Sequence, residues 1–212
     1  MRSLAKSILR GAALAIVLPA VVIAWIQGKL LGADLVFPGW AQLFSLVPGM
    51  TGEYLRHAFY RCLAAQCDDD VCISFGTVAS HPGIRLGQSA YIGNFCSLGN
   101  VTIEKDALIA SHVSVMNGCR QHGTSRLDIP IRLQPGEYEA VTIGEGAWIG
   151  EHATVAASVG RHCIIGAGSL VLHPIPDYAI AVGSPARVIG DRRNAIAPEP
   201  EAIGVQEPAV LC

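Results

Sequence analysis

A six-residue spacing of aliphatic side chains constrains this fold more than any other feature of the chain. A second row, made of small or β-branched side chains, runs two residues before the first. A period of six fits neither a 3.6-residue helix nor long alternating strands. It predicts short strands joined by tight corners and stacked coil upon coil. The aliphatic row is Leu86, Ile92, Leu98, Ile103, Ile109, Val115, Ile143, Ile149, Val155, Val159, Ile165 and Val171, and the small row is Ala90, Cys96, Val101, Ala107, Val113, Val141, Ala147, Ala153, Ala157, Cys163 and Ser169.

Such a coil stack is a β-solenoid, which is expected from about residue 71 to residue 193. The large aliphatic side chains should point inward, with the small ones filling the space beside them. Many of the aliphatic residues are followed by glycine, which we expect to permit a tight corner. Because a solenoid buries its core only by stacking, each coil depends on its neighbours.

The period of six is interrupted once at length, by residues 117–140. An insertion of 24 residues inside a compact domain is usually functional or disordered. It contains one histidine, His122, with Cys119 three residues before it. A neutral imidazole can remove a proton from a hydroxyl group at neutral pH. A solvated surface histidine is the alternative that the residues alone leave open.

The N-terminal region differs in character from the repeat. Residues 11–28 carry no charge and lie between Arg10 and Lys29. As a helix they would reach about 27 Å, just short of a bilayer core, and Pro19 would kink them. A second uncharged stretch, residues 35–52, is broken by two Pro-Gly pairs. We expect a hairpin or a kinked re-entrant membrane segment, with a cleaved signal peptide and a buried core helix as alternatives.

The stretch "EYLRHAFYRCL", residues 53–63, follows as an amphipathic helix. Together these segments predict membrane association through residues 11–63. Basic residues near the N-terminus favour a cytoplasmic start. The apolar face is expected to comprise Tyr54, Leu55, Ala58, Phe59 and Cys62, and the polar face Arg56, His57 and Arg61.

Composition excludes several classes of protein. The formal net charge is -2, from 15 basic and 17 acidic residues, and no basic run marks a nucleic-acid surface. The seven cysteines are scattered, which fits neither a disulfide framework nor a zinc knuckle. We expect the cysteines to be buried free thiols, and we expect no bound metal ion.

Three stretches carry a resemblance to a known family: "LGQSAYIGNFCSLGN" (86–100), "VTIGEGAWIGEHATV" (141–155) and "IGAGSLVLHPIPDYAIAVGSPARVIG" (165–190). They resemble the hexapeptide-repeat acyltransferases, including maltose-type O-acetyltransferases and membrane-associated members that modify polysaccharides. The resemblance implies a left-handed parallel β-helix of triangular section, a mainly β fold, assembled as a homotrimer. The expected domains are a helical membrane-associated region (1–66), the β-helix with its loop (67–193) and a flexible tail (194–212).

The same resemblance implies a set of functional residues. His122 would be the general base, and a Cys119–His122 nucleophile is the rival interpretation. Small residues would let the pantetheine of acyl-CoA approach the backbone, while Leu172-His173 replaces a Thr-Lys pair that is common in the family. The implied donor site is Trp148, Gly150, Gly166, Ala167, Gly168 and Arg187, and the implied acceptor site is Asn117 and Asp128.

The implied activity is acyl transfer, most simply of acetyl from acetyl-CoA, to a sugar hydroxyl of a surface polysaccharide or its lipid-linked precursor. Because CoA is cytoplasmic, the enzyme is expected at the cytoplasmic face of the membrane. Two alternatives stay open. One is a zinc-dependent carbonic anhydrase-like enzyme using His112, His122 and His152, and the other is a catalytically silent trimeric scaffold.

Overall fold

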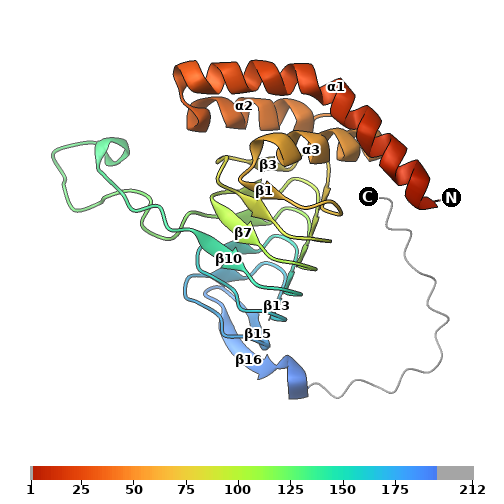
Figure 1. The fold of residues 1–212 in the computed structure, drawn as a ribbon. Coiled ribbons are helices and arrows are strands. Elements are labelled where there is room, and N and C mark those ends of the chain that lie inside the picture. Colours follow the sequence, from red (N-terminus) through yellow and green to blue (C-terminus); the bar gives the residue numbers. More distant parts are fainter. Residues whose placement is uncertain (1, 195–212) are drawn as a thin grey trace, which may run out of the picture.

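The computed structural model describes residues 2–194, with side chains from residue 6 onward. Except for Asn194, the predicted tail lies outside the described residues. Three helices form a cap on one end of a β-solenoid (Figure 1). They are α1 (Arg2–Leu31), α2 (Ala33–Ser45) and α3 (Gly49–Leu63).

The solenoid is the left-handed parallel β-helix that the repeat and the resemblance predicted, with about six coils. It has three faces of short strands. On face A the last coils contribute only isolated bridge residues, Val159 and Ile175, in place of strands. Face A holds β1 (Gln66–Cys67), β4 (Arg85–Leu86), β7 (Val101–Ile103) and β10 (Val141–Ile143). Face B holds β2 (Cys72–Ile73), β5 (Tyr91–Ile92), β8 (Leu108–Ile109), β11 (Trp148–Ile149), β13 (Ile164–Ile165), β15 (Ala179–Val182) and the antiparallel β16 (Arg187–Asp191). Face C holds β3 (Val78–Ala79), β6 (Ser97–Leu98), β9 (Ser114–Val115), β12 (Thr154–Val155) and β14 (Leu170–Val171).

Both predicted rows form the core. Every member of the aliphatic row is buried, and every member of the small row is buried except Ala157, which is half-buried. Equivalent residues of successive coils lie in register, as Ile109, Ile149 and Ile165 do on face B. The side chains therefore stack directly above one another, which explains why the sequence repeats instead of merely alternating.

The predicted reason for the glycines was wrong. Left-handed backbone occurs three residues after each aliphatic residue at the A–B and B–C edges, for example at Phe95, His112 and His152. The glycine directly after the aliphatic residue instead lies against the next coil. A Cβ on Gly144 would be 2.5 Å from the backbone nitrogen of Arg161, and one on Gly93 would be 2.6 Å from that of Ser111. These glycines allow the coils to stack closely.

Gly144→Ala is therefore expected to lower the free energy of unfolding by about 1–3 kcal/mol, because only a shift of backbone relieves the overlap. Gly168 is the matched control, since it has a φ of +67° and open space around it. Gly168→Asn should cost less than about 1 kcal/mol, because asparagine tolerates this conformation. Denaturant unfolding of both variants measures the difference, and equal losses would contradict close stacking as the cause.

All departures from the period of six lie at one edge of the solenoid. Steps across the A–B and B–C edges are six residues long, as from Ile143 to Ile149 and on to Val155. The five-residue step from Leu98, the four-residue step from Val155 and the long insertion all cross from face C to face A. The C–A edge is thus the side on which the chain varies.

The predicted two-faced character of α3 was wrong, because Arg56 and His57 are buried. Helix α3 lies between the other two helices and the first coil, so it has no fully solvated side (Figure 1). The Arg56 guanidinium donates to the carbonyl oxygens of Ile73 (2.8 Å), Phe44 (3.3 Å) and Val47 (2.6 Å). It thereby links the end of α2 to the solenoid.

Burial of His57 favours the neutral form of its imidazole. Its Nε2 lies 2.9 Å from the carbonyl oxygen of Asp68, and burial holds the pKa of the imidazole below its ordinary value near 6.5. As the pH falls below about 6.5, the unfolded chain gains a proton at this position more readily than the folded chain does. The free energy of unfolding should therefore fall with pH from about 7 toward 5, by up to about 1.4 kcal/mol per unit. His57→Gln should flatten this slope in thermal unfolding measured across that range, and an unchanged slope would contradict the assignment.

Candidate active site

Residues 117–140 form an arm that projects from the C–A edge (Figure 1). The outgoing and returning segments of the arm are hydrogen-bonded to each other near the solenoid. There the backbone amide of Glu137 donates to the Arg120 carbonyl oxygen, and that of Glu139 donates to the Asn117 carbonyl oxygen. The Arg120 guanidinium bridges Glu137 at 2.8 Å and Glu139 at 2.9 Å. These hydrogen bonds and ion pairs fix the two segments of the arm to each other, while the arm projects away from its own solenoid.

His122 lies in this arm with its side chain exposed. Within residues 2–194 no hydrogen bond engages its ring, so neither ring nitrogen is occupied by its own chain. The backbone around His122 is closely packed, because the outgoing and returning segments of the arm cross there. A Cβ on Gly136 would be 2.0 Å from the Gln121 carbonyl oxygen and 2.6 Å from the His122 nitrogen. Gly123 likewise lies against Pro135, whose carbonyl oxygen would be 2.6 Å from a Cβ on that glycine.

Sequence reasoning did not single out Gly123 and Gly136, although an "HG" and a "PG" inside a candidate catalytic loop were a usable signal. Gly136→Ala should displace His122 and lower kcat about tenfold or more while the solenoid stays folded, since small misplacements of a catalytic group are costly. Steady-state kinetics measures kcat, and far-ultraviolet circular dichroism checks the fold. Full activity of this variant would show that the crossing does not position the histidine.

The two residues assigned to the acceptor have partners within the chain. The Asn117 Oδ1 accepts a hydrogen bond from the backbone of Asn100, next to β7. Asp128 forms an ion pair with Arg126 two residues away, and this hydrogen bonding holds the pKa of the Asp128 carboxyl below its usual range. Asp128 therefore stays ionised at neutral pH and would meet a ligand only together with Arg126.

The predicted donor residues come together along face B and its edge with face C. Trp148 is half-exposed on β11, and Gly150 begins the corner that follows. The next coil passes close to it, with the Ala167 nitrogen 2.5 Å from where a Gly150 Cβ would be. Gly168 lies in the equivalent corner of that next coil, with open space around it. The structure thus brings five of the six donor residues, Gly166 among them, onto two adjacent coils.

The sixth donor residue, Arg187, lies further along the same face, on β16. Gly166 packs under Val182, and Val182 pairs with Arg187 on β16. The Arg187 side chain is exposed, with Nη1 donating only to the neighbouring Ala186 carbonyl oxygen at 3.1 Å. Its charge is therefore available to an anionic ligand. In a single chain the donor residues and the arm occupy different edges of the solenoid.

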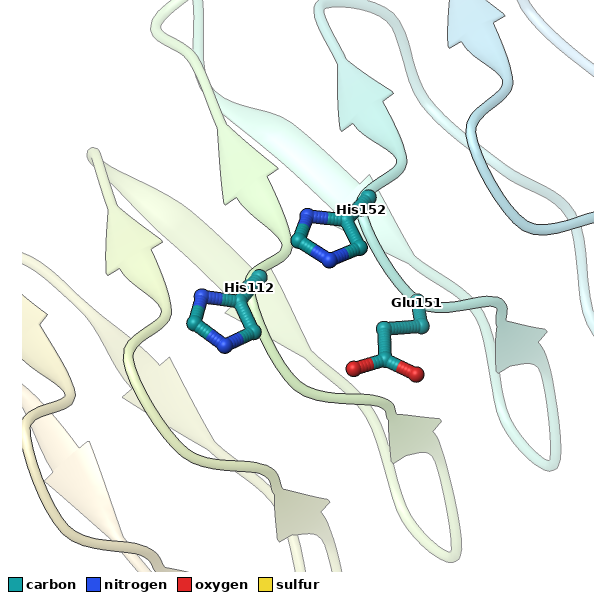
Figure 2. A group of neighbouring side chains, drawn as sticks. All are labelled: His112, Glu151 and His152. Atoms are coloured by element: carbon teal, nitrogen blue, oxygen red, sulfur yellow. The ribbon is translucent and has the colours of Figure 1, made fainter.

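A column of rings runs along the B–C edge beside the donor residues. The ring centroids of His112 and His152 are 4.7 Å apart at an interplanar angle of 8°, and Phe95 stacks on His112 at 5.3 Å. Glu151 lies beside them, and the three possible metal-binding groups are within 4.8 Å of one another (Figure 2). Parallel rings point their ring-plane lone pairs side by side, whereas zinc at about 2.0–2.1 Å needs them to converge. His122 is not part of this group.

Five of the six described cysteines are free, and they separate into two kinds. Cys67, Cys96 and Cys163 are buried free thiols, as expected, whereas Cys62 and Cys119 are exposed. The expectation of a free thiol was wrong for Cys72, which is disulfide-bonded. The Cys119 Sγ lies 3.8 Å from the Leu172 carbonyl oxygen and 4.0 Å from that of Ala156, at the base of the arm. Cys119 thus faces its own solenoid, and no hydrogen bond joins it to His122 within the described chain.

Comparison with known proteins gives a consistent set of relatives. The chain is 32% identical over 139 residues to the serine acetyltransferase of Salmonella typhimurium, covering 66% of this chain and 47% of that protein. It is 34% identical over 105 residues to WbbJ of Escherichia coli, whose name assigns it to lipopolysaccharide biosynthesis O-acetyl transfer, covering 45% of this chain and 53% of that protein. The chain thus spans about half the length of the curated relatives that it matches. No family model matches.

Solved structures share the fold. A galactoside acetyltransferase in complex with coenzyme A superposes with a TM-score of 0.63 and 23% identity, covering 81% of this chain and 82% of that one. A maltose O-acetyltransferase from Clostridium difficile superposes with a TM-score of 0.64 and 21% identity, covering 74% and 87%. In its repeat, its coil geometry and its relatives, the chain is similar to the hexapeptide-repeat acyltransferases.

Proposed function

We propose that this protein is an acetyl-CoA-dependent O-acetyltransferase. The single observation that carries the proposal is the pairing of an arm that presents an unengaged histidine with a solenoid face that gathers Trp148, Gly150 and Gly168. The relatives named above are acetyltransferases, which supports acetyl as the transferred group. WbbJ supports a sugar of a surface polysaccharide, or of its lipid-linked precursor, as the acceptor.

In this mechanism His122 removes the proton from the acceptor hydroxyl while the oxygen attacks the thioester carbonyl. A tetrahedral intermediate forms and collapses, the carbon–sulfur bond breaks, and the imidazolium returns its proton to the thiolate of CoA. The thioester is already activated, so no covalent enzyme intermediate is needed. Arg187 would attract the nucleotide phosphates, and the close-packed glycines would let the pantetheine lie against the backbone.

We further propose that the protein is a homotrimer with each active site between two subunits. The arm and the donor residues leave different edges of one chain, so an arm from a second copy would complete the site. The exposed apolar side chains of the arm support such docking, namely Leu127, Ile131, Leu133 and Tyr138. The helical cap would hold the trimer at the cytoplasmic face of a membrane, where acetyl-CoA is available.

The deciding experiment is mass spectrometry of surface glycans from cells with and without the protein, combined with calorimetry of acetyl-CoA binding. Loss of one acetyl group from a defined sugar supports the proposal. Unchanged glycans together with no acetyl-CoA binding would favour a silent scaffold. Stoichiometric zinc in the purified protein would instead favour the carbonic anhydrase-like alternative, for which the His112, Glu151 and His152 group is the one specific observation.

A further inference from the structure

The outer surface of α1 is apolar and uncovered. Residues 11–28 carry no charge, and only one stripe of the helix is buried, formed by Ala13, Val17, Val21 and Ala24. Nothing within residues 2–194 covers the rest. An uninterrupted apolar surface of this kind marks an interaction site. Its exposed large side chains are Ile8, Leu9, Leu14, Ile16, Leu18, Val22, Ile23, Trp25, Ile26, Leu30 and Leu31.

By length and composition α1 could cross a membrane. Of the helices described, α1 alone qualifies, and its candidate membrane span runs from Lys6 to Leu31. Its 26 residues would reach about 39 Å, which exceeds a hydrocarbon core of about 30 Å. Sequence alone therefore left crossing, re-entrant and surface-bound arrangements open.

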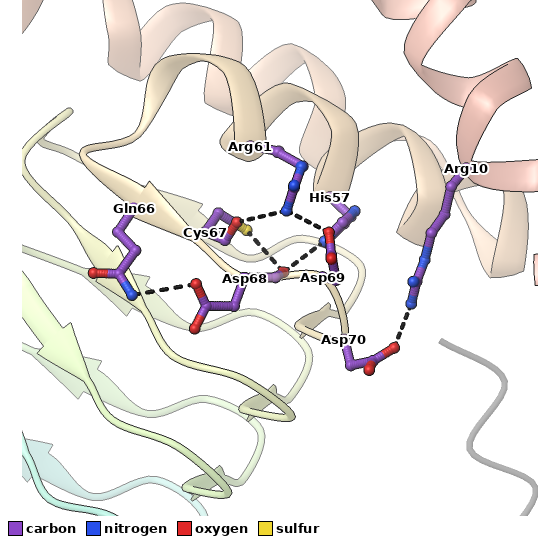
Figure 3. Close-up of polar contacts among 8 residues, drawn as sticks. All are labelled: Arg10, His57, Arg61, Gln66, Cys67, Asp68, Asp69 and Asp70. Carbon is purple, nitrogen blue, oxygen red and sulfur yellow. Dashed lines mark hydrogen bonds and ion pairs between the residues drawn. The ribbon is translucent and has the colours of Figure 1, made fainter. Parts of the chain in front are cut away.

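The contacts of α1 favour one arrangement, because the helix is fixed to the domain along its length. Arg10 forms an ion pair of 2.5 Å with Asp70 in the first coil of the solenoid (Figure 3). Three residues of the buried stripe, Ala13, Val17 and Val21, pack in the core shared with α2 and α3. Beyond it, the Gln27 Oε1 accepts a hydrogen bond of 2.8 Å from the Trp40 indole of α2.

If α1 crossed a bilayer while keeping these contacts, the turn between β1 and β2 that pairs with Arg10 would enter the hydrocarbon. That turn carries Asp68, Asp69 and Asp70, and Arg61 of α3 pairs with Asp69 at 2.5 Å (Figure 3). Charged groups in the bilayer core are costly, by at least about 2.5–3.5 kcal/mol each. A crossing arrangement would therefore require α1 to detach from the domain.

We propose that α1 is an in-plane membrane anchor, whose outer face lies at the boundary of headgroups and acyl chains while both of its ends stay on the side of the solenoid. This inference rests on the membrane attachment proposed above and specifies its geometry. Trp25 and Lys29 suit the interface, with the Lys29 Nζ 5.7 Å from the Trp25 ring centroid. Helix α1 bends partway along, consistent with Pro19 inside it, so that its N-terminal part turns toward the solenoid (Figure 1).

The arrangement fixes the height of the active site above the membrane. The cap covers one end of the solenoid, so the coils are stacked away from the bilayer (Figure 1). The arm follows β9 of the third coil, two coil steps or about 10 Å beyond the first. An acceptor held in the same membrane by a lipid would present its sugar on the side where the arm projects.

Vesicle flotation of the full chain with phosphatidylcholine–phosphatidylglycerol vesicles tests the surface. Val22 and Ile26 lie one turn apart, opposite the buried stripe, and are 48% and 46% exposed. The double variant Val22→Lys/Ile26→Lys should bind vesicles about tenfold less, or weaker still. The matched control is Val188→Lys/Ile189→Lys on β16, at 50% and 66% exposure, which should bind as the wild type does. Equal losses in both pairs, no loss in either, or a wild type that does not bind vesicles would overturn the proposal.

Labelling with a membrane-impermeant maleimide tests the sidedness. Ser7→Cys in the first turns of α1 and Asp34→Cys in the first turn of α2, just after α1 ends, mark the two sides of the helix, and the natural exposed Cys119 is the reference. With protein added outside sealed vesicles, both ends should be labelled to the same extent as Cys119. Protection of one end would mean that α1 crosses the bilayer. Activity toward a water-soluble acceptor in detergent is measured separately, so a failed acetyltransferase proposal is distinguished from a failed anchor.

Discussion

His122→Ala is expected to lower kcat for acetyl transfer about 10²–10⁴-fold, with little change in the KM for acetyl-CoA, because the variant lacks the group that removes the hydroxyl proton. The side chain is exposed and has no hydrogen-bond partner within the described chain, so its removal should leave the arm and the solenoid intact. Steady-state kinetics and calorimetry of acetyl-CoA binding provide the two measurements.

His162→Asn is the matched control for this variant. His162 is a half-buried histidine at the A–B edge with a φ of 55°, a conformation that asparagine tolerates. Its activity should stay within about twofold of the wild type. A folded His122→Ala protein with full activity would refute the general-base role. A loss of the same depth in Cys119→Ala would instead point to the thiol as nucleophile.

Arg56→Met is expected to lower the free energy of unfolding by about 3 kcal/mol or more. Three carbonyl oxygens, of Phe44, Val47 and Ile73, would lose a buried charged donor, and such acceptors cannot recover water. These carbonyls belong to the cap and to the first coil, so the cap should loosen before the solenoid unfolds. Denaturant unfolding gives the size of the loss, and hydrogen exchange shows where it occurs.

Arg61→Met on the same helix is the control. Arg61 is half-exposed and pairs with the exposed Asp69, a kind of ion pair that contributes at most about 1 kcal/mol. Its loss should therefore be several times smaller than that of Arg56→Met. Similar losses in the two variants would mean that burial of the Arg56 guanidinium does not determine the coupling of cap and solenoid.

The sequence predicted the solenoid well because its core repeats. Each coil places one aliphatic and one small side chain inward at each face, so residues such as Ile109 and Ile149 carry the fold in their spacing. The same spacing located the arm, since an insertion appears as a break in a regular pattern. It misjudged Gly144 because close approach depends on the neighbouring coil, which lies 17 residues away at Arg161.

The surroundings of α3 could not be predicted from the sequence. Its residues have the spacing of an amphipathic surface helix, yet Arg56 and His57 are buried between the other helices and the first coil. Hydrophobic periodicity reports one apolar face, and it carries no information about a charged side chain that finds carbonyl partners elsewhere in the chain. Those partners come from two separate segments, the end of α2 and the first coil, which only the folded chain brings together.

By itself, the sequence determined the β-solenoid, its inward-facing rows and the single long interruption with His122, because each of these is a local pattern in a repeating chain. Only the tertiary structure decided that every irregularity lies at the C–A edge, that Gly123 and Gly136 hold the backbone of His122, and that α1 is bound along its length to the cap. These features depend on contacts between segments distant in sequence, where the packing of one backbone against another selects the arrangement.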